Sequence, residues 1–358
     1  MAFDTLIKNG TVIDGTGRLR YDADVGVSRG KIEAIGRLEK AEAARTIDAS
    51  GLVVAPGFID MHSHSDVSLL DDPGGESKAH QGVTTEVIGN CSFSPFPVGP
   101  NRKGNAGMGI FDLPVEWDWT DLDGWAGRLE SQGISLNIAP QVGQASLQMA
   151  VGAIENRPVT EDEMRAMQRL AVEAVEQGAF SVSTGLSLAP SGYMSTGEIV
   201  TLCKAVSSYE GVFYVTHARV GSGRHLSAIQ EAVEIGQRAG IPVQFSHLAI
   251  GFRDAHGRGP EMLEVFENAR AESLDITYDS YPYTAGQAGI NQTIPVWAQA
   301  GGTDEYMARL RDPKTRSRIR EEVTVGIGGL PPLWETWVIA DWPDEGGRHL
   351  IGKSVREI

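Results

Sequence analysis

Five side chains that could bind a transition metal stand shortly after apolar runs of the sequence. His62 and His64 form a His-Ser-His triplet after one run, and Cys91, His217 and His247 each follow another. In an extended segment residues i and i+2 point to the same side, so the imidazoles of His62 and His64 can share one ion. Imidazole and thiolate suit zinc, whereas hard cations prefer oxygen ligands. The set therefore predicts a zinc site.

A His-Ser-His triplet alone would also fit a polar loop without metal, and it is the other three residues that favour a metal site. Cys203 lies inside a predicted helix and is interpreted as a small core side chain. A disulfide between Cys203 and Cys91 is not expected in a cytoplasmic chain. The remaining histidines fall in predicted helices or loops, where we expect solvent to surround them: His80, His225, His256 and His349.

The apolar runs that precede the five residues are interpreted as strands of a parallel sheet. They alternate with helical patterns, which predicts an α/β protein with a (β/α)8-type TIM barrel. The carboxyl ends of barrel strands share one rim, where the active sites of such barrels lie. The runs are residues 53–60, 84–88, 135–139, 180–183, 212–216, 242–246 and 274–278.

Seven strands are one fewer than this barrel requires. After Tyr278 the sequence continues with a loop-rich stretch and a last helical fragment near Ser354. A barrel that lacks a strand leaves two open edges, which is unfavourable for a monomer. Three alternatives stay open: the chain is incomplete, a second chain or a homo-oligomer completes the barrel, or the count of strands is wrong.

Boundary residues predict the ends of several helices. Thr160 and Ser195 each begin a capping box, Gly240 suits a helix end, and Pro260 suits the first turn of the next helix. Residues 4–53 lack a helical period and predict short strands, with a hairpin turn at Asn-Gly 9–10.

Three parts of the chain are expected. Residues 1–53 would belong to a small N-terminal β-sandwich domain, residues 54–285 to the barrel, and residues 286–358 to a tryptophan-containing insertion or lid. The seven tryptophans are interpreted as packing within lid loops, with a pocket for an apolar acyl group as the alternative.

Composition and charge limit the partners of the chain. Of its 358 residues, 41% are hydrophobic and 22% charged, as in soluble globular proteins. The net charge of −16 repels a phosphate backbone, so no nucleic acid is expected as a partner. We see neither an apolar run long enough to span a membrane nor a signal peptide, and therefore expect a cytoplasmic location.

Several segments, in this order, resemble the N-acyl-D-amino-acid deacylases (D-aminoacylases) of the amidohydrolase superfamily, and the resemblance covers essentially the whole chain. The segments are residues 56–66 (PGFIDMHSHSD), 81–91 (QGVTTEVIGNC), 183–186 (STGL), 216–219 (THAR), 246–247 (SH) and 278–286 (YDSYPYTAG).

The resemblance implies a set of metal ligands and a reaction. Cys91, His217 and His247 would form the tight zinc site, and His62 and His64 a looser second one, with Cys91 able to bridge. The reaction would be hydrolysis of the amide bond of an N-acyl amino acid or a related small-molecule N-acyl amide. The family's catalytic base is an aspartate after strand eight, which would lie beyond Ile358, so the catalytic residue is left unknown. We expect Asp66 to orient the histidine pair and Asp279 to support Tyr281.

The substrate pocket departs from the family pattern. Ala249 and Gln287 stand where a lysine and a serine commonly help to hold the substrate carboxylate, and Leu188 stands where an aromatic residue is common. A free D-amino-acid carboxylate is therefore in doubt as the ligand. Arg219 and Tyr281 remain as candidate substrate contacts, with structural roles as the alternative. Two other functions stay open: a cyclic amide or imide hydrolase, and a non-hydrolytic subunit that needs another polypeptide.

Overall fold

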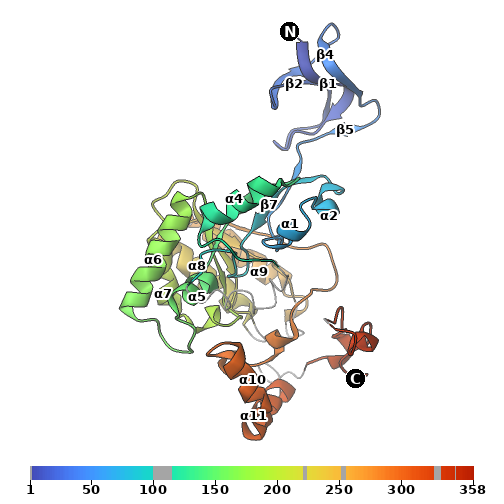
Figure 1. The fold of residues 1–358 in the computed structure, drawn as a ribbon. Helices are drawn as coiled ribbons and strands as arrows, with labels where there is room; N and C mark the ends of the chain where they lie inside the picture. Colours follow the sequence, from blue (N-terminus) through green and yellow to red (C-terminus); the bar gives the residue numbers. More distant parts are fainter. Residues whose placement is uncertain (1, 100–114, 221–223, 251–254, 326–331, 343) are drawn as a thin grey trace. The chain divides into compact units, whose positions relative to one another are not determined.

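The computed structural model describes residues 2–99, 115–220, 224–250, 255–325, 332–342 and 344–358 (Figure 1). The chain divides into two compact units, one of residues 1–59 and 80–85 and one of residues 60–79 and 86–358. Every residue of the candidate metal site belongs to the second unit.

The first unit contains a sheet built from the amino-terminal strands. The sheet order is β3-β2-β1-β4, with β5 paired to β1. β1 runs antiparallel to β2 and parallel to β4 and β5. Phe3, Leu6, Val12 and Val25 are buried in it. The strands are β1 (Ala2–Val12), β2 (Tyr21–Ser28), β3 (Lys31–Gly36), β4 (Glu42–Asp48) and β5 (Val53–Val54). Residues 2–54 thus form one sheet, and the β-sandwich stays a prediction.

The hairpin turn predicted at Asn9 and Gly10 is wrong. β1 runs through both residues, and its pairing with β2 shifts register between Ile7 and Gly10. Asn9 has φ of +63°, a left-handed conformation that asparagine tolerates better than most residues, so the pair makes a β-bulge instead of a turn. The amide of Asn9 donates to Asp24, which holds the bulge on the neighbouring strand.

All seven runs interpreted as barrel strands contain strands. The third run, residues 135–139, contains most of β8, and a second short strand, β9, follows it after Gln141. One sheet has the order β6-β7-β8, and the other has the order β13-β12-β11-β10-β9, with every pairing in the latter parallel. The strands are β6 (Phe58–Asp60), β7 (Val83–Ile88), β8 (Asn137–Pro140), β9 (Val142–Gly143), β10 (Ser181–Gly185), β11 (Phe213–His217), β12 (Val243–Phe245) and β13 (Ile276–Tyr278).

Helices connect the parallel strands, and from α5 to α9 each packs against the next (Figure 1). The capping boxes at Thr160 and Ser195 open α6 and α7, Gly240 caps α8 in the left-handed region, and Pro260 lies in the first turn of α9, all as predicted. The helices are α1 (Ser68–Asp71), α2 (Glu76–Ala79), α4 (Leu122–Gln132), α5 (Gln144–Val151), α6 (Glu161–Glu176), α7 (Thr196–Lys204), α8 (His225–Ala239), α9 (Gly259–Ala271), α10 (Thr303–Arg311) and α11 (Pro313–Val325).

The amino-terminal group of tryptophans contributes to the core. Trp125 is almost fully buried on α4 and donates its indole N–H to the carbonyl of Asp66. Trp117 stacks on Trp119 with ring centroids 5.0 Å apart, and both are buried. These contacts favour packing over an acyl pocket. The prediction that solvent surrounds His225 is wrong. This first residue of α8 is only 8% exposed.

Among the described residues after Tyr278, none joins either sheet. They form α10, α11, short 3-10 turns and one isolated antiparallel bridge between Val338 and Ser354. Within the described part of the chain, no helix is both long and apolar enough to cross a membrane.

Candidate metal centre

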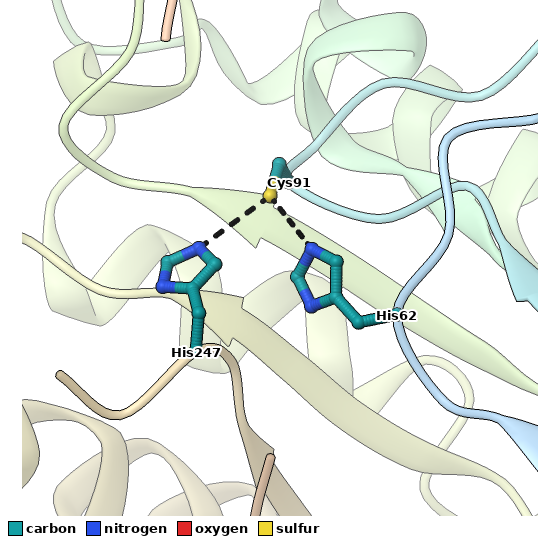
Figure 2. Close-up of side chains that lie close together, drawn as sticks. All are labelled: His62, Cys91 and His247. Carbon is teal, nitrogen blue, oxygen red and sulfur yellow. Dashed lines mark hydrogen bonds between the residues drawn. The ribbon is translucent and has the colours of Figure 1, made fainter. Parts of the chain in front are cut away.

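Four predicted ligands converge from four strands. His62 follows β6, Cys91 follows the turn after β7, His217 ends β11, and His247 comes two residues after β12. Figure 2 shows the side chains of His62, Cys91 and His247 directed toward one another. Their ligand atoms all lie within 4.8 Å of one another. Residues that are far apart in the sequence therefore lie close together in the fold.

The distances in this cluster suit one tetrahedral ion. Cys91 Sγ lies 3.3 Å from Nε2 of His62 and 3.7 Å from Nε2 of His247. A zinc ion bound at ordinary Zn–S and Zn–N distances holds sulfur and nitrogen ligands about 3.6 Å apart. His217 Nδ1 lies 2.9 Å from His247 Nε2, which puts a fourth donor beside the cluster. The residues present therefore fit a zinc ion in donor type and in spacing.

His64 lies beside this cluster. Its ring centroid is 5.3 Å from that of His62, whereas the ring of His62 is 5.1 Å from that of His247. Among the described residues, His62, Cys91 and His247 form a group whose ligand atoms all lie within 4.8 Å of one another. The ring of His217 lies against that of His247, with centroids 4.5 Å apart, so His217 adjoins the same group.

The turn that presents Cys91 depends on unusual backbone conformations. Cys91 and Ser92 have φ of +53° and +81°, and His247 has φ of +38°. Non-glycine residues in this region carry strain, which concentrates at functional sites. Gly89 is required in the same turn, because a Cβ there would lie 2.2 Å from the carbonyl oxygen of Gln141.

Burial lowers the pKa of two imidazoles beside Cys91 and raises that of the thiol itself. It lowers the pKa of His247 to about 4, with a further contribution from His62. It lowers the pKa of His217 well below its ordinary value, with the neighbouring histidines adding to the effect. Burial, and then the charges of Asp279 and Asp66, raise the pKa of the Cys91 thiol. A bound dication would reverse this last shift, because a coordinating thiol is deprotonated.

Asp279 supports the cluster, which corrects the expectation that it supports Tyr281. One of its oxygens accepts a hydrogen bond from the amide of His247 at 2.6 Å and lies 3.4 Å from Nδ1 of His62. The other oxygen accepts from the side chain of Gln244. Burial alone would raise the pKa of Asp279, but the contacts with His62, Gln244 and His247 hold it below its ordinary value.

Asp66 does not contact the histidine pair in the way predicted. It is fully buried, and Oδ1 accepts the amide of Gly89 at 2.6 Å, so it shapes the turn that leads to Cys91. Its Oδ2 has no hydrogen-bond partner among the residues that the structure describes. Burial raises the pKa of Asp66 to about 8.

The two candidate substrate contacts differ in their surroundings. The guanidinium of Arg219 donates to the carbonyls of Gly192 and Met194 at 2.8 and 2.9 Å and pairs with Glu231 at 3.3 Å. These partners occupy most of its donors, which favours a structural role. Tyr281 is 41% exposed.

Two residues near the ligands escaped the sequence analysis. Ser187 Oγ lies 2.5 Å from Nε2 of His217, so it fixes the outer side of that ring. Glu86 is fully buried within β7. A carboxylate in the middle of an apolar strand is a signal that could have been used, because acidic residues are rarely buried without partners. The serine gave no comparable signal, since serines are common in loops.

Comparison with known proteins places the chain among enzymes. The model of the amidohydrolase family matches residues 45–186. A D-aminoacylase from Alcaligenes xylosoxydans xylosoxydans is 34% identical over 351 residues, which cover 96% of this chain and 71% of that protein. The chain belongs to the amidohydrolase family, among the D-aminoacylases.

Solved amidohydrolases agree with this placement and give the chain an α/β amidohydrolase fold. A crystal structure of D-aminoacylase matches with a TM-score of 0.74 and 38% identity over 79% of this chain and 59% of that one. An N-acyl-D-glutamate deacylase from Bordetella bronchiseptica, complexed with zinc and a phosphonate mimic of the tetrahedral intermediate, matches with the same TM-score and 32% identity, over the same 79% and 59%. The chain thus spans about three fifths of these solved relatives.

Proposed function

We propose that the chain acts in the zinc-dependent hydrolysis of the amide bond of an N-acyl amino acid or a related N-acyl amide. The observation that carries this is the cluster of His62, Cys91 and His247, whose sulfur-to-nitrogen distances of 3.3 and 3.7 Å suit tetrahedral zinc. Relatives named as D-aminoacylase and as N-acyl-D-glutamate deacylase support the reaction class.

The residues of the site have separate tasks in this proposal. Cys91, His62 and His247 would hold the ion, with His217 as a further ligand beside His247. When bound, zinc supplies Lewis acidity that polarises an amide carbonyl and makes water nucleophilic near neutral pH. Asp279 orients His62 and His247, and Ser187 orients His217. The carboxylate that transfers the proton is not assigned to a residue of this chain.

We also infer a barrel from the course of the strands. The strand order β9 to β13 follows the sequence, as it does around a barrel wall. His62, after the first strand of the series, lies 3.4 Å from Asp279, after the last. The carboxyl ends of β6 and β13 therefore face the same site, which supports a sheet that curls back on itself. An eighth strand would close it.

The residues at positions 249 and 287 favour a substrate that has no free carboxylate to bind there. Ala249 and Gln287 offer no positive charge, and Arg219 is occupied by Glu231 and by backbone carbonyls. Tyr281 is proposed as the remaining substrate contact, because its ring is exposed. This observation keeps a cyclic amide or imide hydrolase as a second candidate function.

Zinc analysis of the purified protein tests the proposal. We expect zinc in the wild-type protein, its loss in Cys91→Ala, and its retention in Cys203→Ala, which removes the other buried thiol, on α7. Zinc that is absent from the wild type, or that survives Cys91→Ala unchanged, would contradict the site.

Activity of the zinc-loaded protein then separates the substrate classes. The panel contains N-acetyl-D-amino acids, neutral N-acyl amides and hydantoins. We expect hydrolysis of neutral N-acyl amides at least as fast as that of the N-acetyl-D-amino acids, since Ala249 and Gln287 carry no charge to pair with the carboxylate. Turnover confined to hydantoins would select the second candidate.

A further inference from the structure

We propose that Glu86 is a positioning residue that fixes the segment carrying His62 and His64 in the conformation that binds the metal. This inference rests on the proposed function, because it gives the buried carboxylate a task at the same metal site. Neither the family comparison nor the ligand geometry assigns a role to Glu86.

Glu86 holds the segment through the residues on either side of His64. Its Oε1 accepts the hydroxyl of Ser63 at 2.9 Å, and its Oε2 accepts the hydroxyl of Ser65 at 2.5 Å. Glu86 and Ser63 are buried. Each oxygen of this one carboxyl group thus takes a hydroxyl of the segment, so both serines are anchored on the same side.

Anchoring the serines determines where the histidines point. Ser63 and Ser65 alternate with His62 and His64 along the chain, and both serines reach Glu86 while His62 reaches Cys91. The two imidazole rings indeed lie beside each other, with centroids 5.3 Å apart. A rotation of this segment would move the Nε2 atom of His62 away from Cys91.

A charge network extends the anchor to the start of the same segment. Lys78 Nζ lies 3.8 Å from Glu86 Oε1 and forms an ion pair with Asp60. Asp60 in turn accepts the amide of His62 at 3.0 Å. The segment is thus held at its amino-terminal end by Asp60 and at its carboxyl-terminal end by Glu86, and Lys78 joins the two carboxylates. A buried carboxylate needs such partners, because an unpaired one is strongly unfavourable.

Zinc affinity measured on the metal-free full chain tests this task. The variants are Glu86→Gln, which keeps the shape and removes the charge, Ser65→Ala, and the double variant. Competition with a chromogenic chelator gives the zinc dissociation constant, and the visible spectrum of bound Co²⁺ reports the ligand geometry. Leu147→Ala on α5 is the control, since it removes a fully buried side chain outside this network.

We expect each single variant to weaken zinc binding about tenfold, within the range found for partners that orient metal ligands. In the double variant the loss of affinity should be smaller than the product of the two single losses, because both changes disturb the contact between Ser65 and Glu86. The Co²⁺ spectrum should change in both variants and stay unchanged in Leu147→Ala, although the control is less stable.

The inference would be overturned if Ser65→Ala, or a folded Glu86→Gln protein, had the zinc affinity and the Co²⁺ spectrum of the wild type. It would also be overturned if the loss of zinc affinity in the double variant equalled the product of the two single losses. If Glu86→Gln fails to fold, Ser65→Ala alone decides. A wild-type protein that binds no zinc contradicts the proposed function itself, whereas zinc bound equally by all variants contradicts only the role of Glu86.

Discussion

Nδ1 of His62 lies 3.4 Å from Oδ1 of Asp279, although the two residues follow the first and the last strand of the series from β6 to β13. The opposite nitrogen of the same ring, Nε2, lies 3.3 Å from Cys91 Sγ. A carboxylate on one nitrogen fixes the ring so that the other can meet a metal. Asp279 therefore links the end of β13 to the metal cluster.

Asp279→Asn is expected to weaken zinc binding about 10- to 100-fold, because the amide keeps the shape but loses the charge that orients His62. Chelator competition on the metal-free protein measures the change. Asp275→Asn, one residue before β13 and exposed, is the matched control and should bind zinc as the wild type does. Equal affinities for the Asp279 variant and the wild type would refute the orienting role.

Ser187→Ala is expected to weaken zinc binding about fivefold, as the loss of one hydrogen bond worth ~1 kcal/mol would do. The hydroxyl of Ser187 lies against Nε2 of His217 and leaves Nδ1 directed at His247. The same titration measures the effect, with Ser131→Ala on the exposed surface of α4 as its control. An unchanged dissociation constant would mean that His217 needs no such support.

Stability of the metal-free protein should fall as the pH drops below about 6.5. The folded-state pKa of His247 is lowered to about 4 and that of His217 is lowered too, so the unfolded chain binds more protons over this window. For His247 alone the loss between pH 6.5 and pH 4 amounts to at most about 3 kcal/mol. Urea unfolding at pH 6.5 and pH 4 measures this loss, and His247→Gln should flatten the dependence of the unfolding free energy on pH. A slope that the variant leaves unaltered would contradict the assignment.

Gly89→Ala is expected to destabilise the fold by about 2 kcal/mol or more, because the new methyl group would overlap the carbonyl of Gln141 at a left-handed φ. Gly127→Ala is the contrast. It lies on α4 with nothing within 4 Å of the added carbon, so we expect stabilisation of about 0.5–1 kcal/mol. Thermal unfolding of both variants measures the two changes in stability. If Gly89→Ala were as stable as the wild type, the tight turn before Cys91 would be contradicted.

The proximity of the candidate ligands could be predicted from the sequence, since His62, Cys91, His217 and His247 each follow an apolar run, and parallel strands bring their carboxyl ends together. Their supports could not be found in the same way. Asp66 and Asp279 were both recognised as nearby carboxylates, but which atoms they reach depends on side-chain directions and on contacts between distant strands. Asp66 turned out to hold Gly89, and Asp279 to hold His62 and His247.

Local signals succeeded where only a few neighbouring residues decide the structure. The capping boxes at Thr160 and Ser195 are satisfied within one helical turn, so the sequence was sufficient there. Asn9 shows the limit of such reasoning. Asn9 does adopt a left-handed conformation, but β1 continues through the Asn-Gly pair alongside its parallel partner β4, and the pair becomes a bulge within β1.

The low pKa values of His217 and His247 have a consequence for how a dication enters the site. At neutral pH both imidazoles are already neutral, so neither has to lose a proton before it binds a metal ion. Only the thiol of Cys91 must give up its hydrogen. Metal uptake by these three groups should release close to one proton per ion, and its calorimetric heat should therefore vary with the ionisation enthalpy of the buffer.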